Sequence, residues 1–185
     1  MQEGEAVALV LQAEGEADVS TADPIFVGCD PSSRKIALIF AVGEEDPKAR
    51  VFALPQAVIP ALEIAYRVTR RFVRRYVAQG RRVVFWIEEP VVGKGGAYAT
   101  IKQSKVHGAI VAGAVAAGAR VEAVQNSTWK KTVTGKGNNS KVQVAQWVRK
   151  EWKSLSTLVG PDQDLIDAGC IMAHGRIEHY TNRRP

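Results

Sequence analysis

Two short apolar segments of this sequence each end in a carboxylate, and this pattern constrains the fold more than any other feature. The segment Ile25–Cys29 is followed by Asp30, and the segment 82–87 is followed by Glu88. Apolar runs of this length, bounded by turn residues, are typical of buried strands. Because acids at strand ends are well placed to meet at one edge of a sheet, we expect Asp30 and Glu88 to converge.

The rest of the chain predicts further strands that alternate with helices. The expected strands are 35–42, 50–53 and 120–124, and the expected helices are 56–79, 98–117, about 140–153 and one that begins at Pro161. These assignments follow from strand-like composition and from apolar residues at helical spacing. We expect a loop over 132–139. Hairpin strands followed by strands that alternate with helices predict an α/β fold, in which helices flank a mixed five-stranded sheet.

Charge is distributed unevenly along the chain. The 185 residues carry a formal net charge of +6, from 25 Lys and Arg against 19 Asp and Glu. The first 24 residues hold six of the acids and no basic residue, so the remainder carries +12. A basic body of this kind is typical of a protein that binds a polyanion, nucleic acid first. A basic surface that serves only solubility is the alternative.

This distribution suggests three parts. We interpret residues 1–24 as an acidic, disordered N-terminal tail and hypothesise that it transiently covers the basic surface. We expect residues 25–178 to form one domain and residues 179–185 to form a short basic C-terminal tail.

Several classes of protein are not expected. No apolar run approaches the roughly 18–20 residues of a membrane-spanning helix, and the N-terminus lacks the basic region of a secretory signal. The two cysteines, Cys29 and Cys170, cannot form a disulfide framework or a four-cysteine zinc site. We therefore expect a cytoplasmic protein with no membrane partner and with both cysteines reduced in its core.

A second pair of acids, Asp164 and Asp167, is spaced by three residues on the last expected helix, so both face the same way. Carboxylates crowded together raise one another's pKa, and divalent cations relieve this repulsion. Oxygen ligands suit Mg²⁺ or Mn²⁺, and two such ions about 3.5–4 Å apart can promote phosphodiester hydrolysis. Taken singly, each acid is equally compatible with a turn or with a favourable position at a helix N-terminus.

The order of five motifs resembles the RuvC family of Holliday junction resolvases. The matching segments are Val27–Ser33 (G-I-D-P-G-S in the family), Ile87–Glu89 (I-E-Q), Lys130–Gly137 (K-Q-T-V-x-G-x-G), Lys141–Val144 (K-x-Q-V) and Asp164–Ala168 (D-x-x-D-A). The resemblance extends over about residues 25–175. The acidic motifs are shared by the wider RNase H-like superfamily, whereas the segment from Lys130 to Gly137 indicates the resolvases.

This resemblance implies an RNase H-like fold, a homodimer and paired nicks in branched DNA that leave 5′-phosphate and 3′-hydroxyl ends. It implies two Mg²⁺ ions per site, with Mn²⁺ as a substitute, and no nucleotide cofactor. The implied catalytic and metal-binding acids are Asp30, Glu88, Asp164 and Asp167, with Glu89 and Asp162 as neighbouring alternatives. Lys141 would stabilise charge on the phosphate. The candidate DNA-binding lysines are Lys94, Lys102, Lys105, Lys130, Lys131, Lys136 and Lys141.

The sequence departs from the family at one functional position. Many members carry an aromatic residue shortly after the catalytic glutamate, which is thought to stack at the junction centre. Here Glu88 is followed by Glu89, Pro90 and two valines, so Tyr98 is the remaining stacking candidate. This departure leaves junction selectivity open.

Three alternatives therefore remain beside a junction resolvase. One is a looser nuclease for flaps, forks or Y structures, as in a bacteriophage-type relative. Another is a junction-binding protein with a degenerate site. An actin-like ATPase is the third, but the chain is short for a two-lobed core and lacks a second phosphate loop.

Overall fold

The five expected strands pair into one sheet in the computed structural model, which describes residues 23–90 and 96–181. The strands are β1 (Ile25–Pro31), β2 (Lys35–Val42), β3 (Lys48–Ala53), β4 (Val83–Glu88) and β5 (Arg120–Val124). Their order is β3-β2-β1-β4-β5. Strand β2 is antiparallel to β1 and β3, whereas β1, β4 and β5 are parallel. The mixed α/β sheet predicted from the sequence is confirmed.

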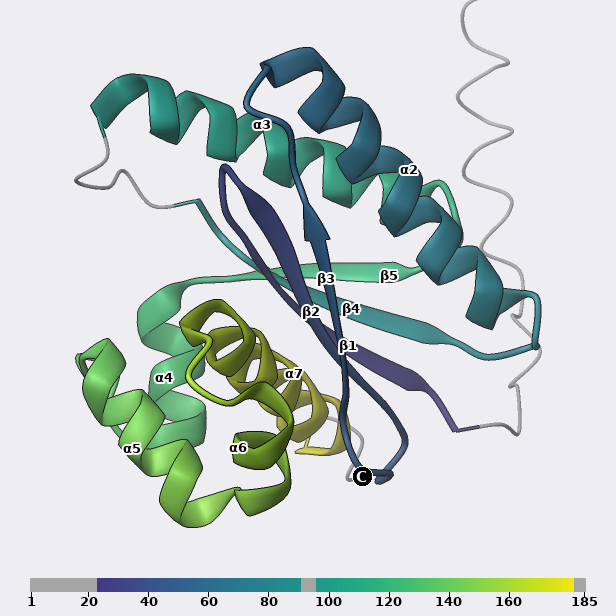
Figure 1. Cartoon of the computed structure of the whole chain (residues 1–185). Helices are drawn as coiled ribbons and strands as arrows, with labels where there is room; N and C mark the ends of the chain where they lie inside the picture. Colours follow the sequence, from purple (N-terminus) through teal and green to yellow (C-terminus); the bar gives the residue numbers. More distant parts are fainter. Residues whose placement is uncertain (1–22, 91–95, 182–185) are drawn as a thin grey trace, which may run out of the picture.

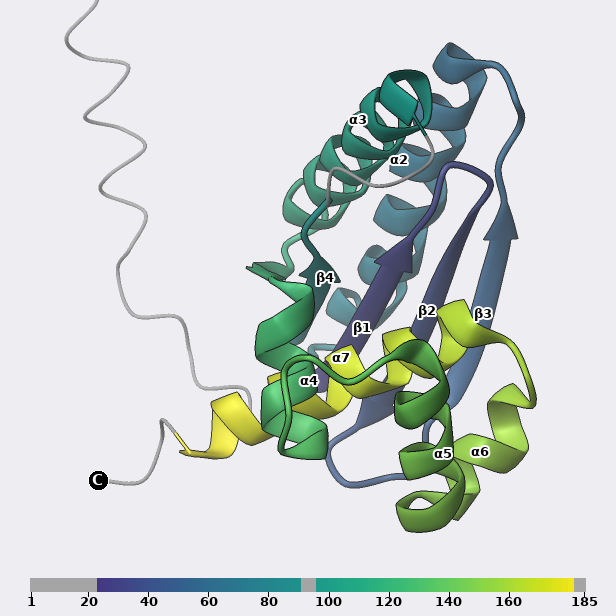
Figure 2. The same cartoon turned by 90° about the vertical axis from the view of Figure 1, so that its left-hand side faces the viewer.

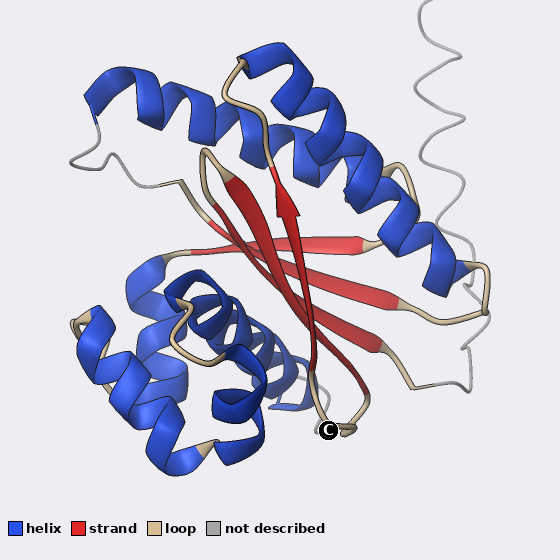
Figure 3. Cartoon of the chain, in the orientation of Figure 1, coloured by secondary structure: helices blue, strands red, loops and turns tan. Residues whose placement is uncertain are grey.

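Helices cover both faces of this sheet (Figure 1, Figure 3). They are α2 (Val58–Val77), α3 (Gly96–Val115), α4 (Asn126–Thr134), α5 (Lys141–Glu151), α6 (Lys153–Val159) and α7 (Gln163–Thr181). Helices α2 and α3 pack together over one face, and α4 to α7 lie on the other, with α7 directly against β1, β2 and β4. Figure 2 shows α7 crossing the strands on the side away from α2 and α3.

Alternation along β1 divides the interior into two apolar cores. Val27 and Cys29 belong to the core under α2 and α3, whereas Phe26 belongs to the core under α7. Gly28, which follows the same alternation as Phe26, lies directly beneath α7. A Cβ atom at Gly28 would lie less than 3.0 Å from the backbone of Ala168 and Met172. The missing side chain therefore allows α7 to approach β1 closely enough to bring its acids over the strand.

Two segments differ from the sequence-based expectation. The start of the expected loop over 132–139 is helical, because α4 continues to Thr134. This helix is short, has no side-chain cap at its N-terminus and buries only Trp129 and Lys130, so it carries little helical pattern. The helix expected over about 140–153 divides at Trp152, whose φ of −131° and ψ of 73° are not helical, and α6 follows.

The last helix also has different ends from those expected. It begins at Gln163 rather than Pro161, because Asp162 caps it: the Asp162 carboxylate accepts hydrogen bonds from the backbone N–H groups of Asp164 (3.0 Å) and Leu165 (3.3 Å). The helix continues to Thr181, so residues 179–181 belong to it and not to a tail. Across residues 23–90 and 96–181, none of the helices combines the length and hydropathy needed to cross a bilayer.

Candidate active site

The first two acids lie side by side on adjacent parallel strands. Cys29 pairs with Ile87 in the register of β1 and β4, so Asp30 and Glu88 are the next residues on each strand. Both alternate onto the α7 side of the sheet, because Val84 and Trp86 of β4 contribute to that core. Their carboxyl groups lie close enough to interact, and this interaction contributes to the raised pKa of Asp30. Asp30 is 7% exposed.

The other two acids come from the first turns of α7. Asp167 is 2% exposed and lies close enough to Asp30 and Glu88 to interact electrostatically with both. Its carboxylate accepts a hydrogen bond from Gln163 Nε2 at 2.8 Å and lies 3.7 Å from Lys141 Nζ. Asp164 is half-buried and ion-paired with Lys35 at 3.2 Å. The close contact at Gly28 thus brings together four carboxyl groups that are far apart in the sequence.

Burial and repulsion by neighbouring carboxylates raise the pKa values of two of these acids, Asp30 and Asp167. Burial, followed by the charges of Glu88, Asp167 and Asp164, raises the pKa of Asp30 well above its usual value. Burial also raises the pKa of Asp167 to about 6, although Gln163 and Lys141 act in the opposite direction. Perturbed carboxyl groups that cluster in this way are typical of functional sites.

Several residues that hold these acids were missed by the sequence analysis. Asn126 Nδ2 and Trp129 Nε1 both donate to Glu88 Oε1, the latter at 3.2 Å. Their spacing of three, directly after a strand, indicates one helix face and is the signal that could have identified them. Gln163, four residues before Asp167, is a second example of two side chains on one helix face.

The structure places the two neighbouring alternatives differently. Both carboxylate oxygens of Asp162 accept hydrogen bonds from Lys35 Nζ, at 2.8 and 2.9 Å, while one of them also caps α7. Glu89 instead interacts with His107 on α3, on the opposite side of the sheet. Glu89 therefore lies away from the cluster, whereas Asp162 shares Lys35 with Asp164 at its margin.

The candidate DNA-binding residues are divided between the two helical layers, α4 to α7 on one face of the sheet and α2 with α3 on the other. Lys131, Lys136 and Lys141 are exposed on or between α4 and α5, and Lys141 Nζ lies 3.7 Å from the Asp167 carboxylate. Lys130 is largely buried, with its ammonium 5.5 Å from the centre of the Trp129 ring, and its charge reaches Asp167. Lys105 is exposed on α3.

One of the candidate lysines is placed differently. Lys102 is buried and donates hydrogen bonds to the carbonyl groups of Pro55 (2.8 Å) and Gln56 (3.0 Å), so we remove it from the DNA-binding candidates. Lys94 lies outside the described residues. Tyr98, the stacking candidate, is 67% exposed near the start of α3.

The four acids supply the oxygen atoms that a divalent cation binds, but their side chains are not arranged as a complete ligand set. Their oxygen atoms are the ligands that Mg²⁺ and Mn²⁺ prefer. The raised pKa values of Asp30 and Asp167 reflect burial first and then repulsion by neighbouring carboxylates, which a cation would relieve. Among the described residues, however, no three His, Cys, Asp or Glu side chains are arranged as a ready ligand set. Asn126, Gln163, Lys35 and Lys141 hold the carboxylates instead. A cation would have to compete with these donors.

Comparison with known proteins identifies the fold. No protein-family profile and no curated protein sequence matches the chain. RuvC from Thermus thermophilus superposes with a TM-score of 0.57, over 85% of this chain and 96% of that chain, at 19% identity. RuvC of the same organism in complex with a Holliday junction substrate gives a TM-score of 0.62 over the same shares, at 15% identity.

A third solved structure, the yeast mitochondrial Holliday junction resolvase Ydc2, matches 88% of this chain and 85% of that chain. Its TM-score is 0.48 and its sequence identity 13%. Because the two RuvC structures are only 19% and 15% identical to this chain, their likeness establishes the fold alone. The RuvC-like fold inferred from the five motifs is therefore confirmed.

Proposed function

We propose that this protein is a metal-dependent endodeoxyribonuclease that resolves four-way DNA junctions by paired, symmetric nicks. The observation that carries the proposal is a cluster in which the buried Asp30 and the half-buried Glu88, at the ends of two parallel strands, meet the buried Asp167 of α7, with Asp164 at its margin. Structural cores do not gain from repelling carboxylates. Support for branched DNA comes from the RuvC fold, which in one solved structure is in complex with a Holliday junction substrate.

In this proposal Asp30, Glu88, Asp164 and Asp167 hold two Mg²⁺ or Mn²⁺ ions. Such ions supply Lewis-acid chemistry, which favours attack of water on a phosphodiester and departure of the 3′-oxygen. A carboxyl group must be deprotonated to bind a cation, so the raised pKa values of Asp30 and Asp167 make binding weaker in mildly acidic solution.

The chain's own residues orient this site. Asn126 and Trp129 fix the Glu88 carboxylate through two hydrogen bonds to one oxygen, which leaves the other oxygen for a ligand. Gln163 holds one oxygen of Asp167 in the same way. Lys141 has an exposed side chain whose ammonium lies 3.7 Å from Asp167, so it can move from that acid to a phosphate of the DNA.

Paired nicks require two such sites, and we therefore infer a homodimer. Each chain contains one cluster, and a four-way junction presents two symmetric strands. The exposed Tyr98 then remains the candidate for stacking on bases near the junction centre.

The test compares a four-way junction, a Y fork and a plain duplex as substrates, each with Mg²⁺, Mn²⁺, Ca²⁺ or EDTA. We expect symmetric nicks in the junction with Mg²⁺ and Mn²⁺ and no cleavage in EDTA. Equal cleavage of fork and junction would instead support a looser branched-DNA nuclease. Tight junction binding without cleavage under any metal condition would support a degenerate, junction-binding protein.

A further inference from the structure

We infer that the acidic N-terminal segment, residues 3–18, docks in a groove between α2 and β3, on the face of the sheet opposite the acids. This groove, here called the arginine groove, is lined by Arg50, Phe52, Val68, Arg71, Phe72, Arg74 and Arg75. Docking there is independent of whether the protein cuts DNA.

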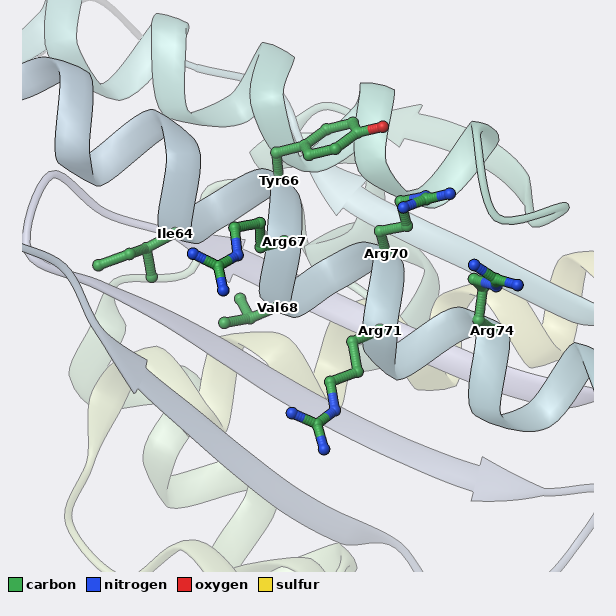
Figure 4. Close-up of a pocket in the computed structure, with 7 residues that line it drawn as sticks. All are labelled: Ile64, Tyr66, Arg67, Val68, Arg70, Arg71 and Arg74. Carbon is green, nitrogen blue, oxygen red and sulfur yellow. The ribbon is translucent and has the colours of Figure 1, made fainter.

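The arginine groove has an apolar floor and a basic rim. It encloses about 710 Å³, with the half-buried Phe52, Val68 and Phe72 at its base. Figure 4 shows the adjoining hollow on the same helix, from which Arg67, Arg70, Arg71 and Arg74 project. An occupant that fits both features has to combine apolar side chains with negative charge.

Three arginines of this helix lack a compensating charge in the part of the chain that the structure describes. Arg67 is paired with Glu63 at 3.2 Å. Within residues 23–90 and 96–181, Arg71, Arg74 and Arg75 have no acidic side chain within ion-pair distance. Like charges three and four residues apart on a helix repel one another. The cluster is therefore stabilised by any bound anion.

The N-terminal segment has the matching composition. Its apolar run, residues 6–11, is flanked by Glu3 and Glu5 on one side and by Glu14, Glu16 and Asp18 on the other. Residues 1–22 contain no Lys or Arg. The run can cover the phenylalanine floor while the flanking acids meet the arginine rim, which plain nucleic acid, with its polar backbone, would not match as well.

The chain also enters the domain at the correct end of the sheet. Arg81 Nη1, just after α2, donates to the carbonyl of Asp23 at 3.2 Å, and Gly43 N donates to Pro24 O at 2.9 Å. Phe40, near the same end of β2, contacts Phe72 of the groove with ring centres 5.1 Å apart.

Reach does not limit this docking. Strand β3 is the edge of the sheet, two strands from β1, which is a separation of about 10 Å. A segment of 22 residues can extend up to about 70 Å, so residues 3–18 can reach the arginine groove with length to spare.

The test uses the full chain with a photo-cross-linking benzoylphenylalanine in place of Leu9, irradiated at low salt and mapped by mass spectrometry. We expect cross-links to residues 48–53 and 64–76. The triple change Arg71→Glu, Arg74→Glu and Arg75→Glu should reduce their yield about 10-fold, because three exposed ion pairs are lost. About 0.5 M NaCl should also reduce it.

A second variant guards against misfolding, because it alters no described residue: Glu3, Glu5, Glu14 and Glu16 are each changed to Gln, and the yield should again fall. The matched control, Arg149→Glu with Lys150→Glu on α5, should leave the yield unchanged. Cross-links that map mainly to α4, α5 or α7, or a yield unaffected by both variants, would overturn the inference. So would occupation of the arginine groove by duplex DNA while the segment cross-links elsewhere.

Discussion

The two faces of the sheet differ in the polar residues that they bury. On the α7 face, the described residues bury Asp30 of β1 together with Asp167, Lys130 and His174 of the helices. On the α2/α3 face, they bury Thr69 and Lys102. Lys102 is satisfied by two backbone carbonyl groups, but Asp30 and Asp167 are buried beside like charges. One strand, β1, contributes to both environments by alternation. The comparison indicates that the α2/α3 face stabilises the fold, whereas the α7 face gives up stability to hold the acids of the proposed active site.

The largest expected difference in cleavage rate is between substitutions of two consecutive acids, Glu88 and Glu89, whose side chains lie on different faces of the sheet. Glu88→Gln should reduce Mg²⁺-dependent junction cleavage about 1,000-fold, because a lost ligand removes several kcal/mol of charge stabilisation. Glu89→Gln, whose side chain interacts with His107 on the α3 side, should cut within a few-fold of the unmodified protein. Single-turnover cleavage rates measure both. Equal losses in the two variants would contradict the division between the faces.

Two glycine-to-alanine substitutions, one beneath α7 and one on α3, compare the packing of the two faces. Gly28→Ala should lower the free energy of unfolding by about 2–3 kcal/mol, because its Cβ would collide with the backbone of α7. Gly108→Ala on α3 meets nothing within 4 Å and should raise stability by up to about 1 kcal/mol. Urea denaturation measures both changes. A neutral Gly28→Ala would show that α7 does not need this close contact.

The third prediction concerns the stability that the α7 face gives up. The pKa of Asp167 is raised to about 6 in the folded protein, from 3.8, chiefly by burial. The stabilisation from its protonation is therefore full below pH 3.8 and is lost as the pH rises through about 6. In EDTA, Asp167→Asn should gain on the order of 2 kcal/mol relative to the unmodified protein between pH 4 and pH 8. Parallel pH profiles of the two proteins would contradict the raised pKa.

The smallest effect separates two exposed lysines. Lys136→Ala, between α4 and α5, should weaken junction binding a few-fold and reduce the slope of log affinity against log salt by about 0.9. Lys105→Ala on α3 should leave this slope unchanged if DNA lies over the α7 face. Binding measured by fluorescence anisotropy at several salt concentrations distinguishes them, and a larger effect at Lys105 would place DNA on the other layer.

The fold could be predicted to the extent that it follows from local pattern. The strands that carry Asp30 and Glu88 at or near their ends are short apolar runs bounded by turns, and such runs can be recognised from the sequence alone. Helix α4 could not be identified in the same way, because only Trp129 and Lys130 are buried and their partners come from β4 and α7.

The site could be predicted only in part for the same reason. Motif resemblance identified the four acids as candidates, and the structure brings them together. The burial of Lys102 against the chain at Pro55 depends on a contact between residues 47 positions apart, which no local pattern contains. The roles of Lys35, Asn126 and Gln163 likewise arise from tertiary packing.

The most direct measurement of the central claim is junction cleavage by Asp30→Asn in Mg²⁺, with junction binding measured in parallel. Asp30 interacts with all three other acids, and Asn has the same shape without the charge. We predict a loss of cleavage of at least about 100-fold with junction binding retained, because the phosphate-facing lysines are unchanged. Cleavage by Asp30→Asn at the unmodified rate would contradict the assignment of this cluster as the active site.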